Sequence, residues 1–297
     1  MLDTLSSGQL LFAALATGAT YALVALGLNL VYGTMRLLNV AHGDVAMLGA
    51  YATYWIFTLV GIGPVGSIIL TALAAALLGV FAYDGLFKGV VARTPNVARL
   101  ESSSLLVFFG ISIVVQNVMA LGFTATARGY EYMNELLRFG GVAMTASRLL
   151  AFAIAAALLV GLLAFLRLHP FGLAMRALIE HREAAAIVGV DVDRVQRTSF
   201  ALGFATSAIA GALISMTEQI SPFMGFPFTI AAFVVVILGG LGNVFGGMIA
   251  ALIFGLIETY GVALTSASYR SILLYGVFVA ILLVRPQGLL GRKAAVR

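Results

Sequence analysis

The sequence predicts an all-α polytopic membrane protein with about eight or nine transmembrane segments. Three observations predict it: 62% of the 297 residues are hydrophobic, only 10% are charged, and the mean hydropathy is +1.08. A soluble domain usually has about 25% charged and about 45–50% apolar residues. This chain therefore carries more apolar surface than one water-facing domain can bury, and we expect lipid to be its solvent.

The apolar segments are long enough to cross a bilayer, which takes roughly 20 residues of helix. No basic residue precedes Arg36, so the basic start of a signal peptide is missing and we expect the first helix to be retained. The expected spans are Gln9–Gly33, Gly43–Val60, Pro64–Phe87, Ser104–Gly122, Leu149–Leu166, Thr198–Thr217 and Ser271–Arg285.

A further apolar segment, Thr229–Tyr260, contains a cluster of glycines. Gly239, Gly240 and Gly242 lie near its middle, and clustered glycine weakens a helix and permits a tight reversal. We therefore expect a glycine-broken helix pair rather than one straight helix, which brings the total to about nine segments. A re-entrant pair would lower the number of full crossings, and both arrangements remain open.

Basic residues predict the orientation. If the stretch 167–197 is cytoplasmic, alternation also places Arg36, residues 88–103 and the C-terminal tail inside. Of the 17 Lys and Arg residues, only Arg128, Arg138, Arg148 and Arg270 then lie outside. This distribution follows the positive-inside rule and predicts an external N-terminus and an internal C-terminus. It also explains the net charge of +5 without nucleic acid as a partner.

Several function classes are excluded by missing residues. The chain has no cysteine, so disulfides, thiolate metal sites and cysteine nucleophiles are excluded. Its two lysines, Lys88 and Lys293, are followed by Gly and Ala, whereas a Walker A loop needs Gly-Lys-Ser/Thr. Three histidines without clustered carboxylates predict neither a metal site nor a catalytic triad. We expect no cofactor and no enzymatic activity, and any ATP must be used by another subunit.

The stretch 167–197 is the most polar part of the chain. We expect Arg176 to Gly189 to form one helix with a face of small residues, and Gly189 to end that helix. Small side chains let another protein approach closely, so this segment is a candidate docking site. An ordinary solvated helix would show the same spacing. The candidate docking residues are Arg176, Glu180, Glu183, Ala184, Ala185 and Gly189.

Uncharged polar residues within the spans are candidates for a translocation pathway. The alternative is that they form hydrogen bonds between helices, worth about 0.6 kcal/mol each. Asp44 and Glu258 are expected at span ends, with Asp44 at a helix N-terminus, and Asp84 is expected to pair with Lys88. Without a carboxylate in mid-span, a neutral or zwitterionic solute is favoured over ion-driven transport. The pathway candidates are Asn29, Asn39, His42, Gln116 and Asn117.

Two further segments carry weaker signals. Residues 123–147 combine aromatic and charged side chains, which could receive a binding protein or form a solvated loop with an interfacial helix. Asn39–Gly43 and Asn243–Gly247 share the pattern Asn-Val-x-x-Gly. Repeated halves are common in transporters, but a match this short also arises by chance, and both explanations remain open.

Four short motifs, spread over most of the chain, together resemble those of a known family. They are Gly27-Leu28-Asn29-Leu30-Val31-Tyr32-Gly33, Leu38-Asn39-Val40-Ala41-His42-Gly43-Asp44, Glu183-Ala184-Ala185 with Gly189, and Gly239-Gly240-Leu241-Gly242. The family is that of the permease subunits of branched-chain amino acid ABC importers, of the LivH type in the LivH/LivM family. The resemblance covers nearly the whole chain, as one transmembrane permease domain, 1–297, with a coupling loop at 168–197. One departure is Ser199-Phe200-Ala201-Leu202, where the general importer loop has Ile-x-Leu-Pro.

The resemblance implies partners and a location. Such permeases work with a second related permease, two cytoplasmic ATP-binding subunits and an extracytoplasmic solute-binding protein, in a bacterial-type inner membrane. The expected solute is a branched-chain or other neutral amino acid, and related permeases for urea or short amides are an alternative. An autonomous secondary carrier or channel, and an integral membrane enzyme, are the competing classes.

Overall fold

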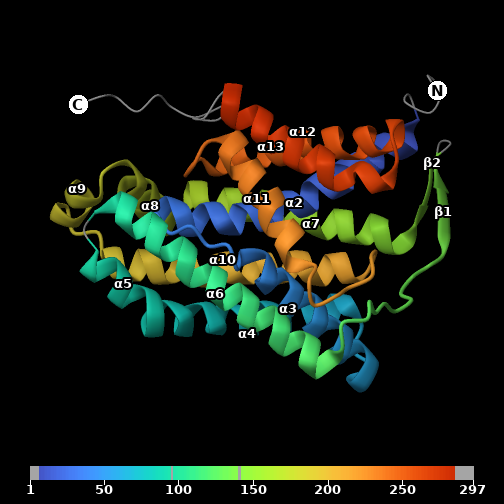
Figure 1. Cartoon of the computed structure of the whole chain (residues 1–297), viewed down its shortest axis with the longest axis horizontal. Coiled ribbons are helices and arrows are strands. Elements are labelled where there is room, and N and C mark those ends of the chain that lie inside the picture. Colours follow the sequence, from blue (N-terminus) through green and yellow to red (C-terminus); the bar gives the residue numbers. More distant parts are fainter. Residues whose placement is uncertain (1–6, 95, 140–141, 285–297) are drawn as a thin grey trace.

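The protein is described by a computed structural model, which covers residues 7–94, 96–139 and 142–284 (Figure 1). Its elements follow one another as α2 (Gly8–Met35), α3 (His42–Trp55), the π-helix η1 (Ile56–Val60), α4 (Pro64–Ala82), the π-helix η2 (Tyr83–Phe87), α5 (Lys88–Arg93), α6 (Val97–Phe123), β1 (Leu136–Phe139), β2 (Val142–Thr145), α7 (Ala146–Leu168), α8 (Pro170–Glu180), α9 (Arg182–Ile187), α10 (Val192–Ser215), α11 (Gly225–Gly239), α12 (Val244–Leu264), the 3-10 helix η3 (Ala267–Tyr269) and α13 (Arg270–Val284).

The helices confirm a polytopic membrane protein. α11 and α13 are apolar but shorter than a full span, and α3 has 14 residues before η1 continues it. The count of eight or nine crossings therefore stays a prediction. The last expected span and the C-terminal tail extend into 285–297, outside the described residues. Six described helices are long and apolar enough to cross a membrane: Gly8–Met35, Pro64–Val91, Val97–Phe123, Ala146–Leu168, Val192–Ser215 and Val244–Leu264.

The fold is helical as predicted, with one small β-hairpin added to it. β1 and β2 pair antiparallel, with Leu136 opposite Thr145 and Phe139 opposite Val142, where an interfacial helix was one expectation. The hairpin lies at one end of the long axis, and α8 and α9 lie at the other (Figure 1). We call these the hairpin end and the α9 end.

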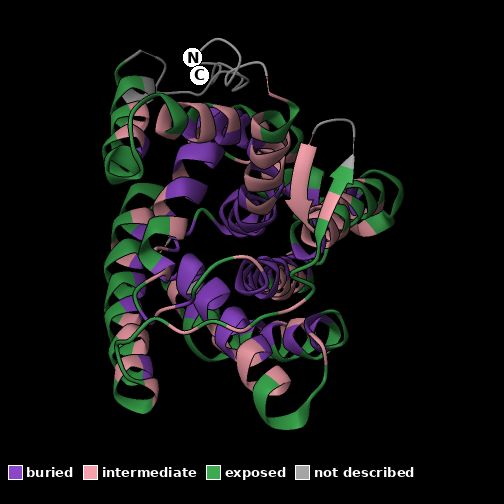
Figure 2. Cartoon of the chain, turned by 90° about the vertical axis from the view of Figure 1, so that its right-hand side faces the viewer, coloured by how far each residue is buried: buried purple, intermediate pink, exposed green. Residues whose placement is uncertain are grey.

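The core of the bundle is built around α2 and α10. α2 packs against α12, α10 and α11, and α10 also packs against α3 and α4. Glycines allow this close packing, because a Cβ at Gly27 would meet the backbone oxygen of Gly203. Buried residues gather at the centre of the bundle, and exposed ones lie on its outer helices (Figure 2). These outer helices expose apolar side chains such as Leu106 and Leu121. An apolar exterior is what a lipid-facing surface requires.

A non-helical segment returns from the end of α2 into the middle of the bundle. α2 ends at Met35, and Arg36 has φ of 57°. After residues 37–41, the His42 Nε2 lies 3.1 Å from the Val24 oxygen. Val24 precedes the end of α2 by eleven residues, which is about 16 Å along the helix axis. Such a segment is tolerated at membrane depth where protein surrounds it, and Asn39 is fully buried.

The glycine-broken helix pair is confirmed. α11 ends at Gly239 and α12 begins at Val244. Gly240 and Gly242 both have positive φ, 90° and 83°, which glycine adopts without steric cost. Asn243 then caps α12, because its side chain accepts a hydrogen bond from the Gly246 amide.

Ion pairs join η2 and α5 to α10 at the α9 end. The Lys88 Nζ lies 2.9 Å from the Asp193 Oδ2, and the Arg197 Nη2 lies 2.8 Å from the Asp84 Oδ2. The expected Asp84–Lys88 pair within one helix is therefore wrong. Asp84 and Lys88 each pair instead with an oppositely charged residue of α10. That residue lies more than one hundred positions further along the chain.

Candidate functional site

The candidate docking segment begins with α8, which folds back onto the end of α7. Pro170 starts α8, and the His169 Nδ1 accepts a hydrogen bond from the Phe171 amide. The Arg176 Nη1 donates to the Leu166 oxygen at 2.5 Å. Arg176 thus caps the carbonyl end of α7, and its guanidinium points toward its own chain.

The expected single helix from Arg176 to Gly189 is wrong, because the chain bends at His181. This residue has φ of −155° and ψ of 101°, and its Nδ1 accepts a hydrogen bond from the Ala184 amide at 3.2 Å. The imidazole therefore acts as the N-cap of α9. Glu180 remains exposed at the end of α8.

α9 ends in a solvent-exposed knob. The Val190 amide donates to the Ala185 oxygen and the Gly189 amide to the Ala186 oxygen, which is the Schellman pattern. Gly189 has φ of 90° and ends the helix as predicted. Ile187 and Val188 beside it are 85% and 77% exposed.

The bend changes which docking candidates are available to another protein. Glu183, Ala184 and Gly189 are exposed, whereas Ala185 is buried. The predicted face of small residues is therefore divided, and the surface that faces outward is the apolar knob with Glu183 at its side. We call residues Arg182–Gly189 the α9 knob.

α8 also contacts the centre of the bundle through Ile179. A Cβ at Gly33 would lie 3.0 Å from the Ile179 Cδ1, and one at Gly242 would lie 3.3 Å from its Cγ2. One side chain thus touches both α2 and the break between α11 and α12.

Asn29, a pathway candidate, is fully buried and clamps that break. Its Nδ2 donates to the Asn243 oxygen at 2.9 Å, and its Oδ1 accepts from the Gly242 amide at 2.7 Å. Both ends of the side-chain amide are therefore bonded to the backbone of the break, at Gly242 and Asn243. The structure places Asn29 in an interhelical hydrogen-bond site, which was the alternative to a place in the pathway.

Three other pathway candidates, Asn39, His42 and Gln116, lie together with Asp44 where α3 begins. Several of their buried polar atoms have no hydrogen-bond partner among the described residues. Asn39 and His42 are fully buried, and Asp44 is 1% exposed. The Asp44 Oδ1 accepts a hydrogen bond from the Gln116 Nε2 at 2.9 Å. Among the described residues, the Asn39 amide, the His42 Nδ1 and the Asp44 Oδ2 have no hydrogen-bond partner.

Asp44 lies in the first turn of α3, as expected, although its carboxylate does not cap this helix. The expected position at a span end is wrong, because its partner Gln116 is nineteen residues into α6. Local sequence could not show this, since the depth follows from the return of residues 37–41 into the bundle. Asn117 lies apart from this cluster, exposed on α6 and bonded to the Ile113 oxygen.

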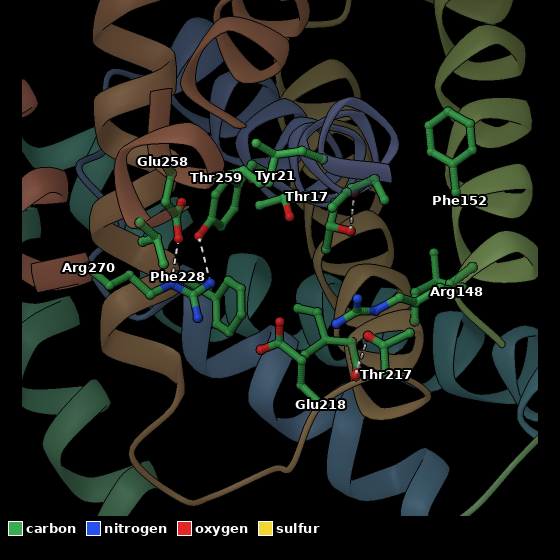
Figure 3. A pocket seen from close by; sticks show the side chains of 18 of the residues that line it. Thr17, Tyr21, Arg148, Phe152, Thr217, Glu218, Phe228, Glu258, Thr259 and Arg270 are labelled. Atoms are coloured by element: carbon green, nitrogen blue, oxygen red, sulfur yellow. Dashed lines mark hydrogen bonds and ion pairs between the residues drawn. The ribbon is translucent and has the colours of Figure 1, made fainter. Parts of the chain in front are cut away.

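A cavity with charged walls lies between α2, α7, α12 and α13 (Figure 3). Its volume is about 360 Å³. Glu258 is 4% exposed and pairs with Arg270 at 2.5 Å, and the Arg270 Nη2 lies 3.4 Å from the Tyr21 Oη. Arg148 and Glu218 line the same cavity.

A second cavity adjoins the first at the hairpin end. Its volume is about 470 Å³, and Arg148 and Glu218 line both cavities. Tyr130 lines the second cavity, with its hydroxyl 2.9 Å from the Ser215 Oγ. Burial raises the pKa of Tyr130 to about 12, so the phenol stays protonated at neutral pH.

Sequence reasoning missed these charged walls. It placed Glu258 at a span end, and it used Arg148 and Arg270 only as markers of orientation. The available signal was Glu258 itself, since an ionisable residue in an apolar helix marks a candidate functional site. Its Arg270 partner is twelve residues away in a different helix, and that pairing needs the tertiary structure.

Comparisons with known proteins identify the family. The family described as "Branched-chain amino acid transport system / permease component" matches residues 10–282. The chain is 30% identical to the permease protein BraD of the high-affinity branched-chain amino acid transport system of Pseudomonas aeruginosa, over 96% of this chain and 95% of the relative. It is also 30% identical to the corresponding LivH of Escherichia coli, with the same coverage.

A second type of permease is similar too. The LivM protein of the Escherichia coli system is 29% identical over 91% of this chain and 67% of its own length. No solved structure matches the chain. The relatives are transport subunits rather than catalysts, and the LivH and LivM matches indicate a permease pair. The chain therefore belongs to the LivH-type permease family of branched-chain amino acid ABC importers.

Proposed function

We propose that this permease subunit forms half of a membrane pathway for branched-chain or other neutral amino acids, and that two cytoplasmic ATP-binding subunits drive it through the α9 knob. The observation that carries this proposal is the exposed apolar end of α9, with Ile187 and Val188 beside Glu183. Exposed apolar groups beside fixed charges favour a protein contact. The chain itself has no Walker A loop to use ATP.

The orientation of the subunit follows from the charges. Lys88, Arg176, Arg182, Arg194 and Arg197 surround the α9 end, which favours a cytoplasmic position for it. The hairpin end then faces the extracytoplasmic side, where a solute-binding protein would deliver the solute. A bacterial-type inner membrane suits this arrangement, and the partner permease would be of the LivM type.

Ile179 supports a mechanical route from the docking site to the bundle. It belongs to α8, which is continuous with α9 through His181, and it contacts Gly33 and Gly242. Movement of the α9 knob on ATP binding would displace this side chain against the glycine break. A break held by a few hydrogen bonds is a suitable hinge between outward- and inward-facing states.

Docking is tested by charge and shape changes on the α9 knob. Glu183→Lys and Ile187→Asp should each abolish co-purification of the ATP-binding subunits with this chain, because each places a mismatched group in the contact. Gly189→Ala should weaken it, because φ of 90° disfavours any side chain. The matched controls are Glu135→Lys, an exposed charge reversal at the hairpin end, and Gly161→Ala, which has open space on α7. Full capture and uptake by all three knob variants would disprove docking at this site.

One observation favours the alternative of an autonomous secondary carrier. Asp44 is a buried carboxylate within the bundle, and such groups often take part in ion or proton pathways. The sequence predicted no carboxylate in mid-span and took this as an argument against ion-driven transport. The position of Asp44 removes that argument. Proteoliposomes that contain this chain and its partner permease, without ATP-binding subunits, separate the two functions. Uptake driven by a proton gradient and lost in Asp44→Asn would support the carrier.

A further inference from the structure

Four charged side chains in the cavity between α2, α7, α12 and α13 divide into a committed pair and an uncommitted pair. Glu258 and Arg270 bind each other, and Tyr21 contacts Arg270. No described residue lies within hydrogen-bond or ion-pair distance of the Arg148 guanidinium or the Glu218 carboxylate. Figure 3 shows Arg148 reaching into the cavity from the right and Glu218 from below, with Glu258 and Arg270 at the left.

The uncommitted pair lies at the junction of two spaces. Arg148 and Glu218 line both the inner cavity and the second cavity at the hairpin end. A solute that arrives from the hairpin end therefore meets this pair before it reaches the Glu258–Arg270 pair. The inner cavity, about 360 Å³, lies in the range of about 300–1,000 Å³ that is usual for small-molecule sites.

The charges favour one chemical class of solute. The charges of the four side chains sum to zero. The uncommitted pair offers one cation, Arg148 on α7, and one anion, Glu218 just after the end of α10. Leaving water costs a zwitterion a large free energy unless both of its charges find partners. Glu218 can accept hydrogen bonds from an ammonium group, and the Arg148 fork can hold a carboxylate through two parallel hydrogen bonds.

The other walls of the cavity are suited to an apolar side chain. They are formed mostly by small or aliphatic residues of α2, α10 and α12 and by aromatic rings on α7 and α11, with threonine hydroxyls among them. An uncharged solute such as urea would leave Arg148 and Glu218 without partners, and a solute of one sign would satisfy only one of them. The apolar lining includes Leu10, Ala13, Ala16, Phe152, Leu213 and Val262.

We propose that this cavity binds the main-chain ends of a free neutral amino acid, with the ammonium on Glu218 and the carboxylate on Arg148, as it enters the permease. The proposal rests on the proposed function, because it names the site at which the importer would receive its solute. It gives the outer half of the chain a selectivity for zwitterions in addition to that of any binding protein.

The test measures equilibrium binding of leucine to the full-length chain in nanodiscs of phosphatidylglycerol. Two analogues each lack one charge: leucinamide has no carboxylate, and 4-methylpentanoate has no ammonium. Both should bind about 10–100-fold more weakly than leucine, the range expected for one lost charge-assisted contact. Urea should not compete. Equal binding of all three organic ligands would overturn the proposal.

Two variants assign the charges. Glu218→Gln should weaken leucine and leucinamide by about 10–100-fold and leave 4-methylpentanoate unchanged. Arg148→Gln should weaken leucine and 4-methylpentanoate and leave leucinamide unchanged. A merely structural role would weaken all ligands together in both variants, and that result would overturn the assignment. Glu135→Gln, an exposed carboxylate at the hairpin end, is the matched control, and thermal stability confirms that each variant is folded.

A lipid headgroup with the same pair of charges is the other possible source of this chemistry. Leucine binding should persist when phosphatidylethanolamine is added to the nanodiscs. If phosphatidylethanolamine displaces leucine fully, the site belongs to lipid and the proposal fails. Capture of the ATP-binding subunits is measured separately. If the chain captures these subunits but does not bind leucine, only the proposed solute site is rejected. If it binds leucine but does not capture the subunits, only the docking proposal is rejected.

Discussion

Asn29 on α2 holds the break between α11 and α12, and Thr229 on α11 holds the break between α2 and α3. The Asn29 side chain bonds to Gly242 and Asn243. The Thr229 hydroxyl donates to the Val40 oxygen and accepts from the Gly43 amide, both at 2.9 Å. Each helix therefore stabilises the break that follows the other.

This reciprocity gives the repeated Asn-Val-x-x-Gly pattern a structural counterpart. Both segments lie in a helix break, and each precedes a helix that starts beside the other break: α3 begins at His42 and α12 at Val244. The two asparagines differ, however. Asn243 caps α12, whereas the buried Asn39 amide has no partner among the described residues. The equivalence of position supports a duplication, while the hydrogen bonds have diverged.

Asn29→Ala should destabilise the protein by about 1–3 kcal/mol, because it leaves the half-buried Gly242 amide without its partner and removes a hydrogen bond to the Asn243 oxygen. The control is Asn117→Ala, which removes one exposed hydrogen bond on α6 and should cost about 0.6 kcal/mol or less. Equilibrium unfolding in mixed micelles measures both. Equal losses would show that the two Asn29 bonds contribute no more than one exposed hydrogen bond within a single helix.

Thr229→Val should release the start of α3, since valine keeps the volume of threonine but cannot bond to Val40 or Gly43. We expect a loss of about 1–3 kcal/mol and faster hydrogen exchange at the Gly43 amide. Thr206→Val is the matched control, because the Thr206 hydroxyl bonds only within its own helix, to the Gly203 oxygen. Unchanged exchange at Gly43 in Thr229→Val would contradict this role.

Ile179→Ala should reduce coupling between ATP hydrolysis and transport. The truncated side chain no longer reaches Gly33 and Gly242, so movement of α8 is less well transmitted to the break. We expect ATP hydrolysis by the assembled importer to continue while solute uptake per ATP falls. Leu173→Ala, an exposed position on the same helix, should leave the ratio unchanged. A normal ratio in Ile179→Ala would rule out this contact as a transmission point.

Gly211→Ala should destabilise the bundle by about 1–3 kcal/mol, the usual cost of overpacking. An added Cβ at this position would meet the backbone of Ala46 on α3, which cannot move without shifting the helix. Gly110→Ala on α6 has open space and should be neutral or slightly stabilising, because alanine favours helix over glycine. Thermal unfolding of both variants compares a tight contact with an open one. Similar midpoints would mean that α3 and α10 separate easily.

Some features could be predicted because they are local in sequence. Gly239, Gly240 and Gly242 weaken a helix wherever they occur together, so the break could be read directly. Gly189 ends α9 because its positive φ suits glycine. The bend at His181 was missed, since histidine is uncommon as an N-cap and nothing nearby signals that its ring would take that role.

The sequence alone determined that the protein lies in a lipid bilayer, that it is helical, and that it belongs to a family of transporter subunits. Composition, hydropathy and short motifs suffice for this, because they can be read directly along the chain. The tertiary structure alone decided the depth of Asp44, the partners of Asp84 and Asn29, and the position of Arg148 and Glu218 on the walls of one cavity. Each of these joins segments that are distant in sequence, and their distances depend on how the helices pack. Packing is a sum of many weak contacts over the whole bundle, and no local pattern encodes it.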